Sequence, residues 1–292
     1  MAKSDFRRYV LVTPVRNEEL TLDATLQSVI GQTVRPAEWV IVSDESTDRT
    51  DEILTSYAAK FSFIQPQRLT GRPARSFASV VFAVGCGVAA LKTRGYDFIG
   101  LLDADVRFTR DYFEQLLDRF AVDPHLGLAG GLALDLVNGR YIHHHQNLRD
   151  VSGAVQFFHR KCFESLGGLT AIPEGGWDTI TCVRARMNGF GTATFPELIV
   201  DHLKSRNIFE GNLLRRNWQL GVRDHALGYH PLFLMAKCCA RILERPPIVR
   251  AAAHLIGSSW AALTQPKRRV PPKLVIYIRQ EQLARLMSFD RL

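Results

Sequence analysis

The sequence predicts an α/β fold in its first 203 residues and a separate helical region in residues 204–292. Between residues 9 and 120, short apolar runs of strand character alternate with segments of helical spacing. This alternation is typical of a mixed, mostly parallel sheet flanked by helices. The chain has 292 residues, of which 46% are hydrophobic and 23% charged, so it can bury one large core and carry an appendage.

The first elements are delimited by turn residues. Residues 9–14 read as a strand that stops at Pro14, and residues 20–30 have apolar side chains at helical spacing. The next apolar run, residues 39–42, is followed by Ser43–Asp48, whose polar side chains favour a turn and a helix N-cap before a helix over 49–60.

The later elements are less sharply bounded. The apolar stretch 77–91 is too short to cross a bilayer, so we expect a buried helix there. Further patterns predict strands and helices up to the end of the chain. Strands are expected at 99–102 and 198–201, and a strand with a loop at 126–136. The helices are expected at 110–120, 181–187, 212–228, 232–243, 248–263 and 273–286.

The stretch Ile99–Val106 is the most informative one. An apolar run ends in Asp103 and Asp105, which are separated only by Ala104. Carboxylates at the carboxyl end of a buried strand suit a hard divalent cation that also takes phosphate oxygens as ligands. The alternative is an ordinary strand-end turn rich in aspartate. The loops near Thr13 and Asp44 follow parallel strands too, so all three loops are expected at one crevice.

Charge is unevenly distributed. The net charge is +8, and residues 204–292 hold 16 Lys and Arg against 5 Asp and Glu. Such a basic region favours binding to phosphate groups in lipid headgroups, diphosphates or nucleic acid. No basic motif interleaved with aromatic residues and no reading helix is evident, so nucleic acid is not an expected partner.

The cysteines and the chain start bear on the compartment. The five cysteines show neither paired metal-ligand spacing nor a disulfide framework, and the first residues have no apolar signal region. We therefore expect a cytoplasmic protein.

Several motifs in a fixed order resemble those of the family 2 glycosyltransferases of the GT-A fold. The resemblance covers roughly residues 8–203, and the motifs are weak singly but specific together. They are Thr13–Glu18, Val42–Thr50, Leu102–Asp105, Phe163–Gly168 and Asp178–Phe190.

The resemblance implies a nucleotide-sugar donor and a role for each matched position. Thr13 and Asp44 would line the nucleotide pocket, and Pro14, Arg16 and Glu18 would belong to the same binding loop, where Arg16 and Glu18 shape the loop. Asp105 would hold Mg²⁺ or Mn²⁺ against the diphosphate, and Asp103 would contact the ribose or the metal. A bound metal stabilises the charge that builds on the leaving diphosphate.

The resemblance also implies a general base, Asp178, which would take the proton from the acceptor hydroxyl. From the residues alone, Asp178 also reads as a helix N-cap before 181–187, and both roles can coexist. The family usually places Glu before this Asp, whereas this chain has Trp177, which leaves the acceptor less predictable. A single base and no candidate nucleophile predict inversion at the anomeric carbon.

Three further sites were considered for metal or phosphate binding. His202 ends a predicted strand, and it is either the last metal ligand or an ordinary strand-end histidine. Arg72 and Arg75 precede the helix at 77–91, where they either contact a phosphate or form a solvated helix start. The run His143–His145 lies in a polar loop without further ligands, so we do not expect a metal there.

The basic helical region also has two interpretations. Apolar faces with a basic rim are typical of helices on an anionic membrane surface, here the inner face of the cell membrane. Packing on the catalytic domain is the alternative. Arg215, Arg216 or Arg223 are also candidates for covering the diphosphate.

The predicted protein is a metal-dependent, inverting glycosyltransferase that uses a saccharide or lipid-linked acceptor in cell-surface polysaccharide synthesis. A non-catalytic scaffold on the same fold is the main alternative, although Asp44, Asp103, Asp105 and Asp178 are all present. A sugar-nucleotide pyrophosphorylase is less favoured because Thr13–Glu18 offers no glycine-rich phosphate loop.

Overall fold

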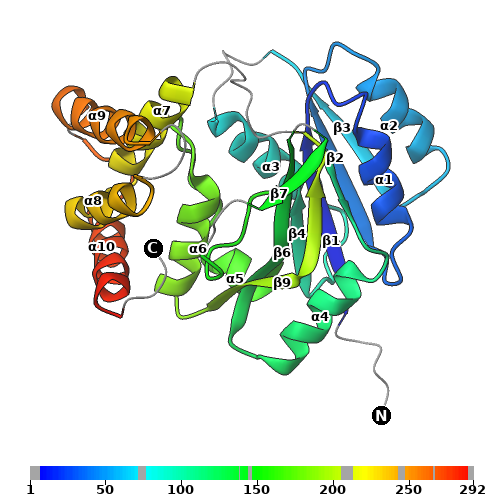
Figure 1. Cartoon of the computed structure of the whole chain (residues 1–292). Helices are drawn as coiled ribbons and strands as arrows, with labels where there is room; N and C mark the ends of the chain where they lie inside the picture. The colour runs from blue at the N-terminus through cyan, green and yellow to red at the C-terminus, as the bar shows by residue number, and fades with distance from the viewer. Residues whose placement is uncertain are drawn as a thin grey trace. The chain divides into compact units, whose positions relative to one another are not determined.

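The computed structural model describes residues 7–71, 77–137, 139–143, 147–204, 213–242, 247–265 and 267–288. The chain forms two compact units (Figure 1). The first unit comprises Met1–Ala171 and Trp177–Arg206, and the second comprises Ile172–Gly176 and Asn207–Leu292. The change of unit therefore lies close to the predicted boundary at residue 203, but a short segment from within the first 203 residues belongs to the second unit.

The first unit contains the sheet and the helices that cover it. The strands are β1 (Tyr9–Val15), β2 (Glu38–Asp44), β3 (Ile64–Leu69), β4 (Phe98–Leu102), β5 (Val106–Phe108), β6 (Leu126–Val137), β7 (Arg140–His143), β8 (Val155–His159) and β9 (Gly191–His202). The helices are α1 (Leu22–Ile30), α2 (Thr50–Ala58), α3 (Ala78–Ala90), α4 (Tyr112–Val122), α5 (Arg160–Ser165) and α6 (Trp177–Met187).

These strands form one mixed sheet in the order β3-β2-β1-β4-β8-β6-β9-β5, with β7 beside β6. Strands β3, β2, β1 and β4 are parallel, so β1, β2 and β4 have their carboxyl ends at one edge. Strand β9 pairs antiparallel with β5, which places His202 opposite Val106. This pairing brings the end of β9 to the loop that follows β4.

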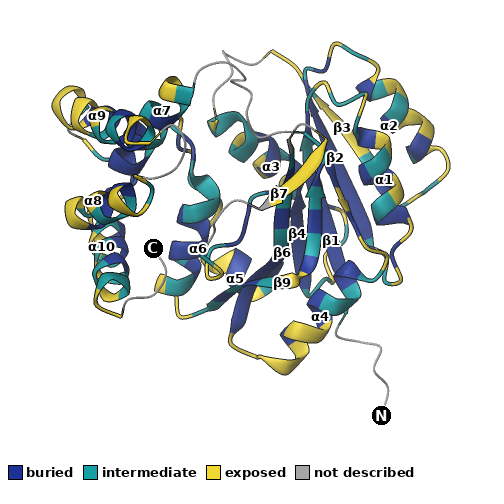
Figure 2. Ribbon diagram, in the orientation of Figure 1, coloured by how far each residue is buried: buried dark blue, intermediate teal, exposed yellow. Residues whose placement is uncertain are grey.

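Alternation along the central strands gives the sheet two apolar faces. Tyr9 and Leu11 pack with residues of α1, α2 and α4, whereas Val10 and Val12 pack with residues of α3, α5 and α6. Figure 2 shows the resulting buried strands between exposed helix surfaces. Burial on both faces explains why these strands read as continuous apolar runs.

The predicted mixed α/β sheet with flanking helices is confirmed, with three differences. Among the described strands, only β3-β2-β1-β4 and β6-β9 pair parallel, and β8, β5 and β7 pair antiparallel. Strand β3 was not expected, since its sequence is polar and contains Pro66, but it lies at the sheet edge, where proline is tolerated. Strands β5, β7 and β8 and the short helix α5 were not expected either, and His143 ends β7 instead of lying in the polar loop that was expected.

Helix α3 also differs from the buried helix that its apolar sequence predicts. It buries only Ala83, Val84 and Gly87. A Cβ on Gly87 would lie 2.5 Å from Val12 Cγ1, so the glycine lets α3 approach the sheet closely. The opposite side remains open, and Phe82 is 53% exposed.

The second unit is helical, which confirms the predicted C-terminal helices. Its helices are α7 (Leu213–Ala226), α8 (Pro231–Ala240), α9 (Val249–Thr264) and α10 (Pro272–Met287). Helices α7 and α9 touch through backbone at two glycines, since a Cβ on Gly221 would lie 2.0 Å from His254 O and one on Gly257 would lie 2.1 Å from Trp218 O. Any larger residue at either position would force the two helices apart.

A buried ionic cluster joins three of these helices. Asp224 of α7 is 0% exposed, and its carboxylate contacts Lys237 of α8 at 2.7 Å and His254 of α9 at 3.0 Å. The neighbouring Arg223 lies 3.0 Å from the same carboxylate. Burial alone would raise the pKa of Asp224, but the charges of Lys237 and Arg223 outweigh it and hold the pKa well below its usual range.

In the described segments, no helix combines the length and the apolar character that a membrane crossing requires.

Candidate metal and nucleotide site

The Asp103–Asp105 loop is held in place by backbone contacts. Asp103 N donates to Ala154 O of the adjacent segment at 3.0 Å. The buried hydroxyl of Thr25, on α1, lies 2.8 Å from Ala104 O and accepts from Val106 N at 3.0 Å. The backbone contact of Asp103 and the Thr25 contacts on either side of Asp105 therefore hold the acidic loop at the end of β4, and the sequence motifs did not single out Thr25.

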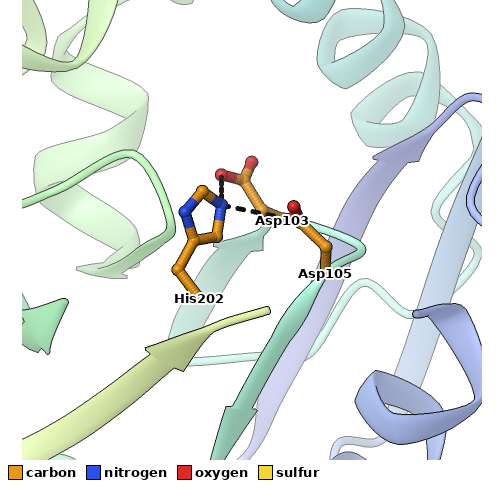
Figure 3. A group of neighbouring side chains, drawn as sticks. All are labelled: Asp103, Asp105 and His202. Carbon is orange, nitrogen blue, oxygen red and sulfur yellow. Dashed lines mark ion pairs between the residues drawn. The ribbon is translucent and has the colours of Figure 1, made fainter. Parts of the chain in front are cut away.

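His202 meets both aspartates at this edge of the sheet. Its Nε2 lies 3.2 Å from Asp105 Oδ1 and 3.9 Å from Asp103 Oδ2. Figure 3 shows the three side chains pointing toward one another. The exposed fractions of these side chains are 34% for Asp103, 13% for Asp105 and 9% for His202, so the cluster is accessible mainly from the Asp103 side.

A fourth side chain, Asp135 of β6, lies behind the imidazole. Its Oδ1 is 3.1 Å from His202 Nδ1, and the residue is 2% exposed. Asp135 was not predicted as a site residue, although an aspartate within the apolar run Leu132–Leu136 indicates a buried polar contact.

The carboxylates control the protonation of His202. Burial favours the neutral imidazole, but the hydrogen bonds with Asp105 and Asp135 outweigh burial and raise the pKa of His202 to about 10. The metal-free cluster therefore holds an imidazolium between carboxylates. A cation that bound the cluster would replace this proton.

The donor set fits a divalent metal ion. One ligand atom each from Asp103, Asp105 and His202 lie within 4.8 Å of one another. Two carboxylate oxygens and one imidazole nitrogen suit Mn²⁺ or Mg²⁺, and such ions commonly fill their remaining positions with phosphate oxygens and water. His202 is thus located where the metal-ligand interpretation requires it.

The predicted nucleotide-binding residues occupy the ends of β1 and β2. Asp44 ends β2 and is 7% exposed, and Pro14 and Arg16 lie at the end of β1. Arg16 Nη1 lies 3.9 Å from Glu45 Oε2, so it links the two loops. Thr13 differs from the expectation of a pocket-lining side chain, because it is 0% exposed and its hydroxyl accepts from Trp39 Nε1 at 2.9 Å.

Glu18 also has a local structural role. Its backbone oxygen accepts from Leu22 N at 2.9 Å, and its carboxylate accepts from Thr21 Oγ1 at 2.6 Å and pairs with Lys204. Lys204 follows β9, so this pair ties the β1 loop to the strand that carries His202. A role of Glu18 in shaping the loop was expected from the sequence, whereas its pairing with Lys204 was not.

The loops after β1 and β2 both pass through the left-handed backbone region. Asn17 has φ 54° and Glu45 has φ 56°, values that side-chain-bearing residues rarely adopt. The Asn17 side chain accepts from Thr47 N at 2.8 Å, and Asn17 N donates to Ser46 Oγ at 3.2 Å. These cross-loop bonds hold the two loops together in a strained conformation, which is common at ligand sites.

Asp178 lies in the first turn of α6. Its Oδ1 accepts from Thr179 N at 2.8 Å, and its Oδ2 lies 3.4 Å from Gly153 N. Gly153 precedes Ala154, whose oxygen binds Asp103 N, so Asp178 contacts the segment that borders the acidic loop. These contacts are those expected of a carboxylate at the start of a helix. Through Gly153, they also place Asp178 next to the segment that holds Asp103.

Some predicted positions lie outside the described residues. These are Arg72, Arg75, His144 and His145, together with the side chain of His143.

This chain is similar to several known proteins. The profile of the Glycosyl transferase family 2 matches residues 10–176. A poly-beta-1,6-N-acetyl-D-glucosamine synthase of Staphylococcus aureus strain COL is 28% identical over 117 residues, which is 39% of this chain. The chain spans only 26% of the length of that relative.

Two solved structures share the fold. The mannosyltransferase PcManGT of Pyrobaculum calidifontis, in complex with GDP-Man and Mn²⁺, has a TM-score of 0.57 at 18% identity, covering 99% of this chain and 89% of that one. Residues 1–349 of S. aureus TarS in complex with UDP give a TM-score of 0.55 at 13% identity, covering 97% and 73%.

Proposed function

Because this chain belongs to glycosyl transferase family 2 and is a glycosyltransferase of the GT-A fold, we propose that it transfers a sugar from a nucleoside-diphosphate sugar to a hydroxyl group. The acceptor in this proposal is a saccharide or a lipid-linked saccharide. The observation that carries the proposal is the cluster of Asp103, Asp105 and His202 at the carboxyl ends of the central strands. Ligands of open α/β sheets bind at this edge.

In the proposed site, Asp103, Asp105 and His202 hold Mg²⁺ or Mn²⁺. The metal supplies charge stabilisation for the leaving diphosphate. Asp44, nearly buried at the end of β2, faces the base or the ribose, and the locked loops after β1 and β2 fix its position. Arg72 remains a candidate phosphate contact on the sequence resemblance alone.

Asp178 is the proposed general base. Its carboxylate takes the proton of the acceptor hydroxyl while the hydroxyl oxygen bonds to the anomeric carbon and the bond to the nucleoside diphosphate breaks. Attack from the face opposite the leaving group inverts the anomeric configuration. Product of retained configuration, read from the anomeric coupling in NMR, would contradict this mechanism.

The donor and pathway are proposed from the relatives. Two structural neighbours were solved with GDP-Man and with UDP, so both nucleotides are suitable probes. A relative named as a polysaccharide synthase supports a role in cell-surface polysaccharide synthesis. Because the match spans a quarter of that relative, its activity is not transferred to this chain.

Peripheral membrane contact of the second unit is a further part of the proposal. Leu232, Met235, Ile256, Leu263 and Ile276 are large apolar residues with at least half of their surface exposed. Residues 204–292 carry a net positive charge. Apolar side chains with basic neighbours favour an anionic surface, and we place the enzyme at the inner face of the cell membrane.

The donor experiment measures thermal stability with UDP and GDP, each with and without Mn²⁺. A ligand that binds only the folded protein raises the melting temperature. We expect one diphosphate to stabilise the wild type only with metal, and Asp105→Ala to remove this effect. If neither nucleotide shifts the melting temperature with or without Mn²⁺, the proposed donor class is wrong and the scaffold alternative gains support.

The membrane experiment is independent of the donor. Sedimentation with vesicles containing phosphatidylserine is compared with vesicles of phosphatidylcholine alone. We expect binding to the anionic vesicles that weakens with added salt. Absence of binding to both vesicle types would overturn the membrane part only.

A further inference from the structure

Asp135 occupies a position on the buried face of β6, where core side chains are expected. Alternate residues of this strand, Gly131, Ala133 and Asp135, are buried, while Leu132, Leu134 and Leu136 are partly exposed. Burying an ionised carboxylate is costly unless it is paired and hydrogen-bonded. A residue of this kind in a strand interior therefore requires a specific partner.

The sheet register supplies that partner. Strands β6 and β9 run parallel, and Asp135 and His202 are direct cross-strand neighbours. Asp135 Oδ1 lies 3.1 Å from His202 Nδ1, and Nε2 of the same ring faces Asp105 and Asp103. The imidazole thus stands between a deeply buried carboxylate and the proposed metal ligands.

We propose that Asp135 is a positioning residue that makes His202 a metal ligand. It accepts a hydrogen bond from Nδ1–H, which leaves the Nε2 lone pair directed toward the space that Asp103 and Asp105 share. Outer carboxylates of this kind fix the tautomer and the ring orientation of ligating histidines and raise their basicity. This inference rests on the metal role proposed for the cluster.

Asp201, the residue before His202, provides a matched control for Asp135. Asp201 is also a carboxylate on β9, and it forms a cross-strand pair with Arg107 of β5 at 2.9 Å. It is adjacent to His202 in sequence but makes its ion pair with Arg107 rather than with the imidazole. Asp201→Asn therefore removes a nearby charge and an ion pair without removing the Nδ1 contact.

The experiment titrates the full-length metal-free protein with Mn²⁺ by calorimetry. Asp135→Leu, which restores the apolar strand pattern, is expected to weaken Mn²⁺ binding by about 10–100-fold. Asp135→Asn keeps an oxygen that can accept from Nδ1–H, so it is expected to bind Mn²⁺ more tightly than Asp135→Leu. Asp201→Asn is expected to match the wild type.

A spectroscopic measurement separates positioning from a general structural role. Pulsed electron paramagnetic resonance of bound Mn²⁺ detects imidazole nitrogen through its hyperfine coupling. The wild type and Asp135→Asn should show this coupling, whereas Asp135→Leu at saturating Mn²⁺ should have lost or weakened it. Circular dichroism confirms that each variant is folded, and Asp135→Asn provides the test if Asp135→Leu does not fold.

The outcomes distinguish this inference from the proposed function. Wild-type affinity and nitrogen coupling in both Asp135 variants would overturn the positioning role but leave the metal site intact. If Asp135→Leu does not fold, wild-type Mn²⁺ affinity in Asp135→Asn would overturn the role as proposed, because the neutral amide does not raise the basicity of the imidazole as the carboxylate does. If the wild type binds no Mn²⁺, the positioning role and the metal part of the proposed function both fail.

Discussion

Buried carboxylates have opposite charged surroundings in the two units of this protein. In the first unit, three carboxylates (Asp103, Asp105 and Asp135) surround one imidazole, and Asp103 is still 34% exposed. In the second unit, one fully buried carboxylate, Asp224, is surrounded by Lys237, Arg223 and His254.

The difference in charge balance separates a binding site from a structural cluster. Among its own four residues, the first cluster has more carboxylates than cationic groups, so a divalent ion and a proton compete for it. Asp224 is already surrounded by cationic groups from its own unit, and its cluster joins α7, α8 and α9. The first cluster should therefore control function, and the second should control stability.

The largest expected effect concerns catalysis. Asp178→Asn keeps the size of the side chain but removes the proposed base, so the transfer rate should fall by about 10²–10⁴-fold. Calorimetry should show unchanged binding of the nucleoside diphosphate. Transfer at the wild-type rate would remove Asp178 from the mechanism.

The next effect concerns stability of the second unit. Asp224→Asn removes the carboxylate that Lys237 and Arg223 share, and breaking such a buried pair should cost about 3–5 kcal/mol of unfolding free energy. Urea unfolding followed by circular dichroism measures this loss. The control is Glu197→Gln, which breaks an exposed pair with Arg119 and should cost about 0–1 kcal/mol. Equal losses in both variants would contradict the structural role of Asp224.

The last expected effect is a difference in pH dependence between the two clusters. The folded pKa of Asp224 is lowered, so its contribution to stability is complete above the unfolded value of about 3.9 and is lost as the pH falls below it. The folded pKa of His202 is raised to about 10, so in the metal-free protein its contribution is complete below the unfolded value of about 6.5. It is lost as the pH rises from there toward 10.

Variants show which group causes the loss of stability at acid pH and which causes the loss at alkaline pH. Urea unfolding is measured across this pH range for the wild type, Asp224→Asn and His202→Gln. Asp224→Asn should flatten the acid limb and His202→Gln the alkaline limb. A profile that keeps both limbs in both variants would show that neither group is responsible.

The sequence predicted best those strands that are buried on both faces and the polar loops that follow them. The runs of β1, β2 and β4 are buried on both faces, and their apolar composition predicted them and the polar loops at their ends. Asp103 and Asp105 were found in the same way, because they interrupt such a run. Helix α1 likewise follows from apolar side chains at helical spacing.

Long-range pairing could not be read from local patterns. The contacts of His202 with Asp105 and Asp135 depend on which strands are neighbours, and these residues are far apart in the chain. Thr25 and Lys204 were missed for the same reason. The pocket-lining role expected of Thr13 followed from its place in a motif, whereas its burial against Trp39 follows from the packing of β1 on β2.

The most direct test of the contrast between the units is calorimetric Mn²⁺ binding, measured with thermal melting, for the wild type, Asp105→Asn and Asp224→Asn. We predict that Asp105→Asn loses Mn²⁺ binding and lowers the melting temperature less than Asp224→Asn does. Asp224→Asn should melt well below the wild type and, at a temperature where it remains folded, bind Mn²⁺ normally. Retained Mn²⁺ binding in Asp105→Asn, or its loss in folded Asp224→Asn, would contradict the assignment of one cluster to function and the other to stability.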